Sequence, residues 1–508
     1  MECPGLRCLR NRVSRCTSQL SIVAIAALVF AFSYLAQPTW ANELAHYDLV
    51  RALAVGSPNV DASRGFPLLH TGDLTRLHGH FYSTKAPGLA AASLPPYLAL
   101  RTAGVVTTTN PKSVVWALHL WSIVLPAGVL LLLVRRRAEC VEPGFGTIAA
   151  VSIGIGSLML PFSTLFFAHV LSATLGFAAF VLLSHKKGSA LLAFLGGLVA
   201  GLAFNVEYTL GVVALVLVLV VLEYPEQRLR RLGLYSLGVA LGALPAFVFN
   251  TWAFGSPFHL PQEGWHGTGG TPLPGLLGLT HPSVKNVLII LFYPGGIGPI
   301  LLPAIAGAFL LWRRGARLEA ALPMLIAGLF LVFNAASVDP FGGASPGPRF
   351  MIATLPFLAV PLAVALRAFP GATLGLIVGG GAFMVAATLT HPLEALDGHV
   401  IHRLVTGHWI DSITAGVGLR GSIWDVPFLI AIGVAAAAAI AVTPWRFVVR
   451  RDLFAFLVAL CAWVVVSNTI DDLSRDGWHG EATGIAATVF SGALIAAGYR
   501  LQARPRLR

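Results

Sequence analysis

Long apolar stretches, each of about 14 to 25 residues, alternate with shorter polar segments along the whole chain. A helix rises about 1.5 Å per residue, so roughly 20 apolar residues are enough to cross the hydrocarbon core of a bilayer. The pattern therefore predicts an all-α polytopic membrane protein with about fourteen transmembrane helices. The predicted spans are residues 20–37, 113–134, 147–165, 170–184, 189–205, 209–222, 233–253, 287–311, 318–336, 350–366, 371–390, 427–443, 453–468 and 483–499.

The one long polar passage before residue 254 runs from Trp40 to Gly88, directly after the first apolar stretch. It holds four acids, four histidines, three arginines and Lys85, in a chain that is only 11% charged. We expect the chemistry of the protein to lie in this passage. The first apolar stretch also fits the core of a signal peptide, but cleavage near Ala41 would detach the helix that carries Glu43, so we interpret it as the first span.

The distribution of charge decides whether the apolar segment 87–106 crosses the membrane. If it does not cross, 23 of the 34 lysines and arginines fall in short loops on the side of the N-terminal tail, as the positive-inside rule requires. We therefore predict that 87–101 is a helix in the outer interface and that both termini are cytoplasmic. Residues 38–112 then form an outer loop with two interfacial helices.

The composition excludes several classes of function. A chain that is 56% hydrophobic, with a mean hydropathy of +0.78, is not a soluble protein. Its net charge of +12 is explained by the loop clusters, so nucleic acid is not an expected partner. The spans carry almost no ionisable residue at mid-depth, which argues against a proton-coupled pump.

Within the outer loop, Asn42 is the expected N-cap of a short helix that runs to about Val55. Glu43 then lies in the first turn, where the helix dipole favours the ionised carboxylate. His46 and Tyr47 follow at three and four residues and share its face. Glu43 is thus suited to act as a general base or a metal ligand, although it could equally serve only to stabilise the helix start.

Other candidates are cations and polar groups near outer helix ends. Lys85, in the run GHFYSTKAPG, precedes the interfacial helix and could meet a lipid phosphate or simply extend its ammonium toward water. Arg349 closes the turn FGGASPGPR, and its guanidinium could bind phosphate or act as a positive anchor. His169 and Glu207 lie at outer ends of spans. No histidine pair has a strong metal-ligand spacing, so we predict no dedicated metal site and leave a divalent cation open as a cofactor.

The order of these features resembles the GT-C glycosyltransferase superfamily, in particular the protein O-mannosyltransferases, the lipid A aminoarabinose transferases and a set of bacterial members. The features are one span, an acid at the start of the first outer loop, the pair Gly72-Asp73, the tract GHFYSTKAPG and an interfacial helix. The segments FFAHVLSATLGFAAF (166–180), GLAFNVEYTLG (201–211) and FGGASPGPRF (341–350) extend the resemblance over about the first 370 residues.

The resemblance implies that Glu43 is the catalytic base and that Lys85 binds the phosphate of a lipid carrier, with Arg349 beside it. Two residues depart from the family pattern, namely Asn42, where an acid is common, and Thr84, which replaces an acid of the aminoarabinose transferases. Asp73 is therefore the reserve candidate for the base. Residues expected to orient the base or the donor are His46, His80, Tyr82, His169 and Glu207.

The function so implied is the inverting transfer of a sugar from a polyprenyl-phosphate donor to a hydroxyl acceptor, at the outer face of the cytoplasmic membrane. The acceptor would be a glycolipid, a cell-envelope glycan or a protein. The expected organisation is a basic cytoplasmic tail (1–19), a GT-C-like catalytic module (20–370) and additional helices (371–508). The alternatives are a lipid or small-molecule transporter or flippase, and a family member that binds lipid carriers without catalysis.

Overall fold

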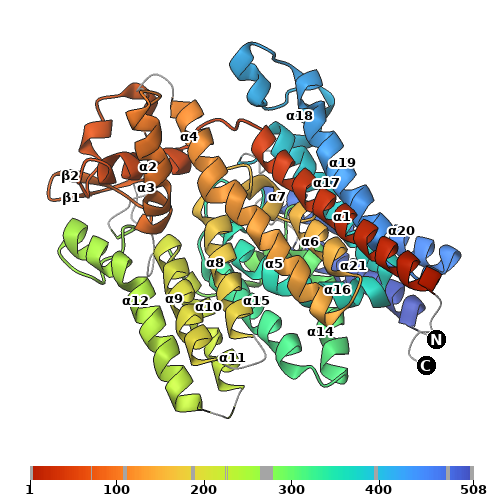
Figure 1. Cartoon of the computed structure of the whole chain (residues 1–508). Coiled ribbons are helices and arrows are strands. Elements are labelled where there is room, and N and C mark those ends of the chain that lie inside the picture. The colour runs from red at the N-terminus through yellow and green to blue at the C-terminus, as the bar shows by residue number, and fades with distance from the viewer. Residues whose placement is uncertain are drawn as a thin grey trace.

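The structure is a computed structural model of the 508-residue chain, shown in Figure 1. It describes residues 4–69, 71–106, 111–184, 189–223, 225, 227–263, 278–393, 399–475 and 481–503. Helices dominate these residues and pack side by side into a bundle. Parts of the predicted outer loop 254–286 and of the C-terminal tail, including Arg504, Arg506 and Arg508, lie outside the described residues.

Among the described residues, seven helices are long and apolar enough to cross a membrane, and six more are shorter and apolar. Four of the long helices are single elements: Arg228–Phe254 (α12), Arg317–Ala336 (α15), Pro370–Thr390 (α17) and Val449–Asp472, which lies within α20 (Val449–Arg475). The helix Pro111–Val141 consists of α4 (Pro111–His119), a π-helical turn (Leu120–Val124) and α5 (Leu125–Val141). The other two begin with a 3₁₀ turn: Arg349–Ala368 consists of η4 (Arg349–Thr354) and α16 (Leu355–Ala368), and Ser422–Val442 consists of η7 (Ser422–Asp425) and α19 (Val426–Val442). The shorter helices are Gln19–Tyr34 within α1 (Pro4–Tyr34), Gly146–Ile155 (α6), Ala168–Leu183 (α8), Ala190–Val206 (α9), Leu210–Leu222 (α10, Leu210–Val216; α11, Val218–Leu222) and Gly298–Arg313 (α14).

All fourteen predicted stretches fall on helices, the last on α21 (Glu481–Ala503), which confirms an all-α polytopic membrane protein. The number of spans stays a prediction. The outward faces of the bundle are apolar, as lipid-facing surfaces are: Leu125 of α5, Val248 of α12 and Leu457 of α20 are 54%, 58% and 48% exposed.

Three predicted spans are divided, which corrects the continuous helices expected there. The stretch 147–165 holds α6 and the short α7 (Met159–Phe162), 209–222 holds α10 and α11, and 287–311 holds α13 (Val284–Phe292) and α14. The break in 287–311 occurs because backbone crosses backbone there. A Cβ at Gly295 would lie 1.7 Å from the carbonyl oxygen of Pro346, and one at Gly347 would lie 2.0 Å from that of Gly295. Only glycines allow this approach, so the break supports the loop that precedes Arg349.

The first outer loop contains the two expected helices, α2 (Ala41–Leu53) and α3 (Pro87–Thr102). The N-cap of α2 is Trp40, so the prediction that Asn42 is the N-cap was wrong. The loop also contains an antiparallel hairpin that the helical pattern did not predict, formed by β1 (Leu74–Leu77) and β2 (His80–Ser83). The two strands are too short to give a clear alternation of apolar and polar residues. Figure 1 shows α2, α3 and the hairpin together beside the ends of α9 and α12.

The predicted outer segments meet at one end of the bundle. Trp40 packs against His391 with 4.3 Å between ring centroids, and the Ala36 N–H donates to the Asp411 carbonyl at 3.0 Å. Loop 391–425, which carries α18 (Val400–Val405), therefore covers the end of α1.

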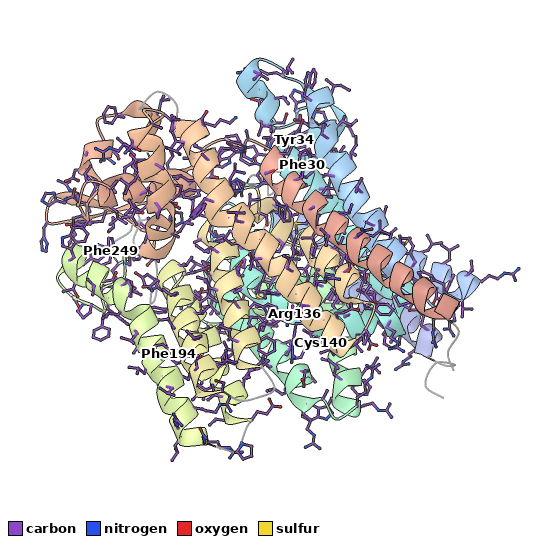
Figure 2. All side chains as sticks on the ribbon, in the orientation of Figure 1. Phe30, Tyr34, Arg136, Cys140, Phe194 and Phe249 are labelled. Carbon is purple, nitrogen blue, oxygen red and sulfur yellow. The ribbon has the colours of Figure 1, made fainter. Side chains whose placement is uncertain are left out.

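Basic clusters meet at the other end. Buried Glu142 pairs with Arg314 at 2.7 Å and with Arg367, which joins α5 to α14 and α16. Figure 2 labels Arg136 and Cys140 toward this end of α5, far from Tyr34 at the opposite end of α1. The two ends of the bundle thus differ in charge as the topology prediction requires, whereas the side of the membrane that each faces stays a prediction.

The helices after residue 370 share the core of the rest of the chain. α19 packs along α1, and α17 packs against α6, α7 and α14 as well as α20. Ala435 and Ala439 of α19 belong to the same buried cluster as Leu28 of α1. Small side chains let these helices approach closely, as is common between membrane helices.

Candidate functional site

Glu43 lies in the first turn of α2, and its carboxylate is enclosed by backbone donors. Its Oε2 accepts the Trp40 N–H at 2.9 Å and its Oε1 accepts the Phe166 N–H at 2.8 Å, with 2% of the residue exposed. Burial raises the pKa of Glu43 to about 7, although the two N–H donors lower it. The carboxylate joins the start of α2 to the segment before α8. A catalytic role for it stays a prediction.

Lys85 follows β2 and forms an ion pair with Asp73, which precedes β1. Its Nζ donates to Asp73 Oδ2 at 2.9 Å, and the two side chains are 14% and 17% exposed. The hydroxyl of Thr84 donates to the Asp73 carbonyl at 3.1 Å, so the threonine that replaces a family acid closes the hairpin. Burial lowers the pKa of Lys85, and Arg349 lowers it further, while Asp73 raises it.

A glycine contact places this pair beside α9. Gly88 is the second residue of α3, and a Cβ there would lie 2.5 Å from the carbonyl carbon of Asn205 and from the nitrogen of Val206. The start of α3 thus rests directly on the backbone at the end of α9. Because Lys85 comes three residues before this contact and Glu207 one residue after α9, the two segments that carry them are neighbours.

Arg349 is enclosed by the glycine-rich turn before it. Gly342 and Gly343 have φ angles of +77° and +114°, which favour glycine, and a Cβ on Gly343 would lie 3.3 Å from the guanidinium nitrogens. The guanidinium carbon lies 5.9 Å from the ring centroid of Phe167 and 5.7 Å from that of Phe350. Its Nε is buried without a hydrogen-bond partner among the described atoms. A buried donor of this kind is suited to an anionic ligand.

His169 and Glu207 form a buried pair between α8 and the end of α9. The Nδ1 of His169 lies 2.9 Å from Glu207 Oε2, and the Ser172 hydroxyl donates to the same oxygen at 2.8 Å. The imidazole packs edge-on against Phe162 and Phe350, with ring centroids 5.4 Å and 5.6 Å away.

Electrostatic interactions join these residues into one cluster. The buried His46 of α2 interacts with Lys85, His169 and Arg349. Burial lowers the pKa of His46 well below its ordinary value, and these positive groups lower it further. Arg349 in turn interacts with Asp73, Glu207 and Asp339. The sequence-predicted residues that the fold brings together are His46, Asp73, Lys85, His169, Glu207 and Arg349.

His80 and Tyr82 have contacts that lead away from this cluster. His80 Nδ1 lies 2.6 Å from Asp61 Oδ2 at an exposed part of the hairpin, and Tyr82 packs against Phe254 of α12 with 5.1 Å between ring centroids. Their expected role in the substrate site stays a prediction.

Two residues that the sequence pattern did not indicate lie beside these groups. Ser172 stands three residues after His169 on the same helix face, a spacing that could have indicated it. Asp339 accepts the N–H groups of Phe341 and Gly343 at 3.0 Å and 2.7 Å and shapes the turn that encloses Arg349. An aspartate before Pro-Phe-Gly-Gly is typical of such side-chain-capped turns.

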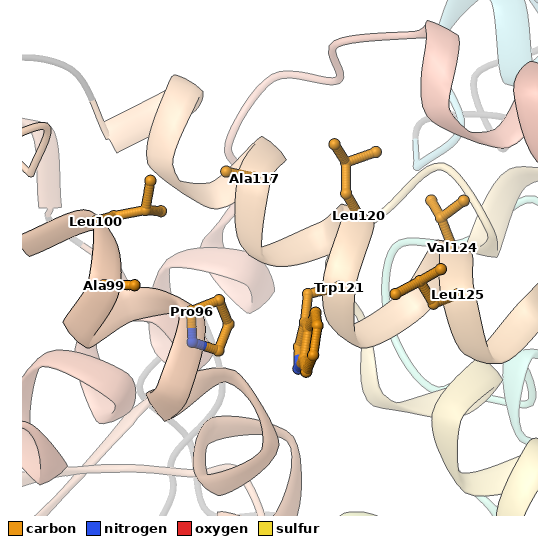
Figure 3. A pocket seen from close by; sticks show the side chains of 8 residues that line it. All are labelled: Pro96, Ala99, Leu100, Ala117, Leu120, Trp121, Val124 and Leu125. Atoms are coloured by element: carbon orange, nitrogen blue, oxygen red, sulfur yellow. The ribbon is translucent and has the colours of Figure 1, made fainter. Parts of the chain in front are cut away.

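An apolar groove of about 470 Å³ lies between α3 and the helix that begins with α4, as Figure 3 shows. Its walls carry no charged residue, and the π-helical turn Leu120–Val124 forms part of them. The groove is lined by Pro96, Ala99, Leu100, Ala117, Leu120, Trp121, Val124 and Leu125. Among the described residues, no group of three or more histidines, cysteines or acids is placed to hold a metal ion.

No protein-family model matches the chain, and no curated protein matches it significantly. Among solved structures it is similar to ArnT from Cupriavidus metallidurans bound to undecaprenyl phosphate, with 16% identity, a TM-score of 0.46, and coverage of 97% of this chain and 76% of that one. It is also similar to the oligosaccharyltransferase AglB from Archaeoglobus fulgidus in complex with an inhibitory peptide and a dolichol-phosphate, with 14% identity, a TM-score of 0.41, and coverage of 87% of this chain and 58% of that one. Both neighbours are members of the GT-C superfamily.

Proposed function

We propose that the protein is a membrane glycosyltransferase that moves a sugar from a polyprenyl-phosphate carrier to a hydroxyl acceptor. The observation that carries the proposal is the pair of largely enclosed cations, Lys85 and Arg349, which two separate loops bring together where the outer loop meets the bundle. A transfer of this kind breaks the bond between the anomeric carbon and a phosphate oxygen. Negative charge then grows on that oxygen, and preorganised cations stabilise it.

The state of each cation fits an anionic ligand. Among the described atoms, the ammonium of Lys85 donates to Asp73, and Arg349 has a buried Nε–H without a partner. A phosphate oxygen offers acceptors to both and replaces the charge that Asp73 supplies to Lys85. The glycines at 342 and 343 let the guanidinium and the Phe350 ring pack directly against the backbone of the turn, which holds Arg349 in place.

The apolar groove beside α3 suits the hydrocarbon part of such a carrier. α3 begins two residues after Lys85 and runs past the groove at Pro96, Ala99 and Leu100. A chain of isoprene units has no hydrogen-bonding groups and can therefore occupy a groove without polar partners. The neighbour ArnT was solved with undecaprenyl phosphate, a carrier of this chemical class.

The outer face of the cytoplasmic membrane is the proposed location, because the site lies at the end of the bundle opposite the arginine clusters. Labelling of a cysteine introduced at exposed Ala62, in a protein without its native cysteines, tests this. A membrane-impermeant maleimide should label intact cells expressing the variant. Labelling only after the cells are opened would place the site in the cytoplasm and reverse the topology.

The activity is tested with purified protein in nanodiscs and a panel of undecaprenyl-phosphate-linked sugars. We expect Lys85→Met and Arg349→Met each to raise the apparent KM for the donor about tenfold or more and to slow turnover. Lys112→Met is the matched control, because Lys112 is a half-exposed outer lysine whose described partner is Asp411, 3.9 Å away. Binding of undecaprenyl phosphate without turnover of any donor would instead favour the carrier-binding or transporter alternatives.

A further inference from the structure

The hydrogen bond between His169 and Glu207 has a defined donor and acceptor. Burial raises the pKa of Glu207, but His169 and the hydroxyls of Ser172 and Thr209 outweigh this, so its pKa lies below the ordinary value. An ionised carboxylate has no proton to donate. The proton in the 2.9 Å contact therefore belongs to His169 Nδ1, and the lone pair of the ring is then on Nε2, which has no partner among the described atoms.

The two carboxylates that could also accept a proton are already engaged. Both oxygens of Glu43 accept backbone N–H groups, at 2.9 Å and 2.8 Å, and the residue is 2% exposed. The described contact of Asp73 Oδ2 is the ion pair with Lys85. The described hydrogen bond of His169 is through Nδ1, and Nε2 has no partner among the described atoms, so its lone pair is open to an acceptor hydroxyl.

The imidazole also stands next to the proposed phosphate site. Phe167 and Phe350 contact both groups: their ring centroids lie 6.1 Å and 5.6 Å from that of His169, and 5.9 Å and 5.7 Å from the guanidinium carbon of Arg349. A sugar whose phosphate rests on Arg349 and Lys85 would therefore have its anomeric carbon near His169.

We propose that His169 is the general base of the transfer and that Glu207 is the residue that positions it, an inference that rests on the function proposed above. The proton of the acceptor hydroxyl passes to His169 Nε2 while the hydroxyl oxygen forms a bond with the anomeric carbon. The bond between that carbon and the phosphate oxygen breaks, and its electron pair leaves with the polyprenyl phosphate on Lys85 and Arg349. Glu207 stabilises the imidazolium that results.

Glu207 lies against Nδ1 of His169, and His46, Lys85 and Arg349 belong to the same electrostatic cluster. Glu43 is the other candidate base near the start of the outer loop, so it must be tested in parallel.

The test is the pH dependence of kcat/KM for a donor that the wild-type protein turns over in nanodiscs. We expect His169→Gln to lower kcat about 10²- to 10⁴-fold, while binding of undecaprenyl phosphate stays within about twofold. We expect Glu207→Gln to lower kcat less than His169→Gln does and to change the acid limb of the profile. We expect Glu43→Gln to retain the acid limb.

His119→Gln is the matched control, because His119 is another buried histidine. Its Nε2 lies 2.8 Å from the carbonyl of Ser163, in the segment between α7 and α8. It should leave the pH profile unchanged. Near-wild-type kcat in a folded His169→Gln protein, or loss of the acid limb in Glu43→Gln alone, would overturn the assignment while the proposed function stands. Turnover of no donor by the wild type would remove the proposed function, and the base with it.

Discussion

The ion pair between Lys85 and Asp73 should affect how tightly the protein binds the lipid carrier. If the phosphate binds Lys85, it competes with the Asp73 carboxylate for the same ammonium. At 2.9 Å and an effective dielectric constant of about 20, the two charges attract by about 6 kcal/mol. Desolvation of both groups and screening leave a net contribution of about 1 kcal/mol for a pair with some exposure.

We therefore expect Asp73→Asn to tighten binding of undecaprenyl phosphate about fivefold, since 1.4 kcal/mol corresponds to tenfold. Lys85→Met should weaken binding about ten- to hundredfold, because it removes a charge-assisted hydrogen bond. In the double variant the gain from Asp73→Asn should disappear, because the effect acts through Lys85. Titration of nanodisc-embedded protein followed by isothermal calorimetry measures all three.

Asp61→Asn is the matched control, because Asp61 is an acid of the same loop that pairs with His80 at the exposed part of the hairpin. It should leave the dissociation constant unchanged within about twofold. Weaker binding by Asp73→Asn would refute the competition and show that Asp73 holds Lys85 in place for the phosphate. A large fall in kcat with tighter binding would instead identify Asp73 as the base.

Three further predictions concern stability, each measured by thermal unfolding in nanodiscs. Because burial raises the pKa of Glu43 from 4.5 to about 7, the native state binds the extra proton between these values. The stability of wild type relative to Glu43→Gln should thus fall by about 2 to 4 kcal/mol from pH 4.5 to pH 8, and a constant difference would contradict this. Gly88→Ala places a Cβ against the α9 backbone and should cost about 1 to 3 kcal/mol and weaken undecaprenyl phosphate binding, whereas Gly65→Ala, in open space, should do neither. Glu142→Gln leaves two arginines that are 47% and 49% exposed, so it should cost only about 1 to 2 kcal/mol without changing carrier binding; a larger loss would mean that water does not solvate them.

The apolar pattern was sufficient to locate the helices. Within a membrane every backbone polar group must be hydrogen-bonded inside the protein, and a helix needs a minimum number of consecutive apolar residues to cross, so the apolar runs in the sequence mark the helices. The distribution of Lys and Arg, and not the apolar pattern, predicts that α3 does not cross the membrane, and this topology stays a prediction. The hairpin 74–83 was not predictable in this way. Its four-residue strands show no periodic pattern. They are held by hydrogen bonds from the Thr84 hydroxyl to the Asp73 carbonyl and from the Ser83 hydroxyl to the Ala45 carbonyl.

By itself, the sequence determined the membrane-spanning helical class, the position of the long polar loop and the identity of its charged residues. Only the tertiary structure decided how those residues are paired. In the sequence, Glu43 and His169 are both polar residues near helix ends. In the structure, backbone N–H groups enclose the Glu43 carboxylate, whereas the His169 imidazole is hydrogen-bonded to the Glu207 carboxylate. The physical reason is that protonation and hydrogen bonding depend on burial and on partners 35 to 123 residues away, which glycine contacts at Gly88 and Gly295 bring within reach.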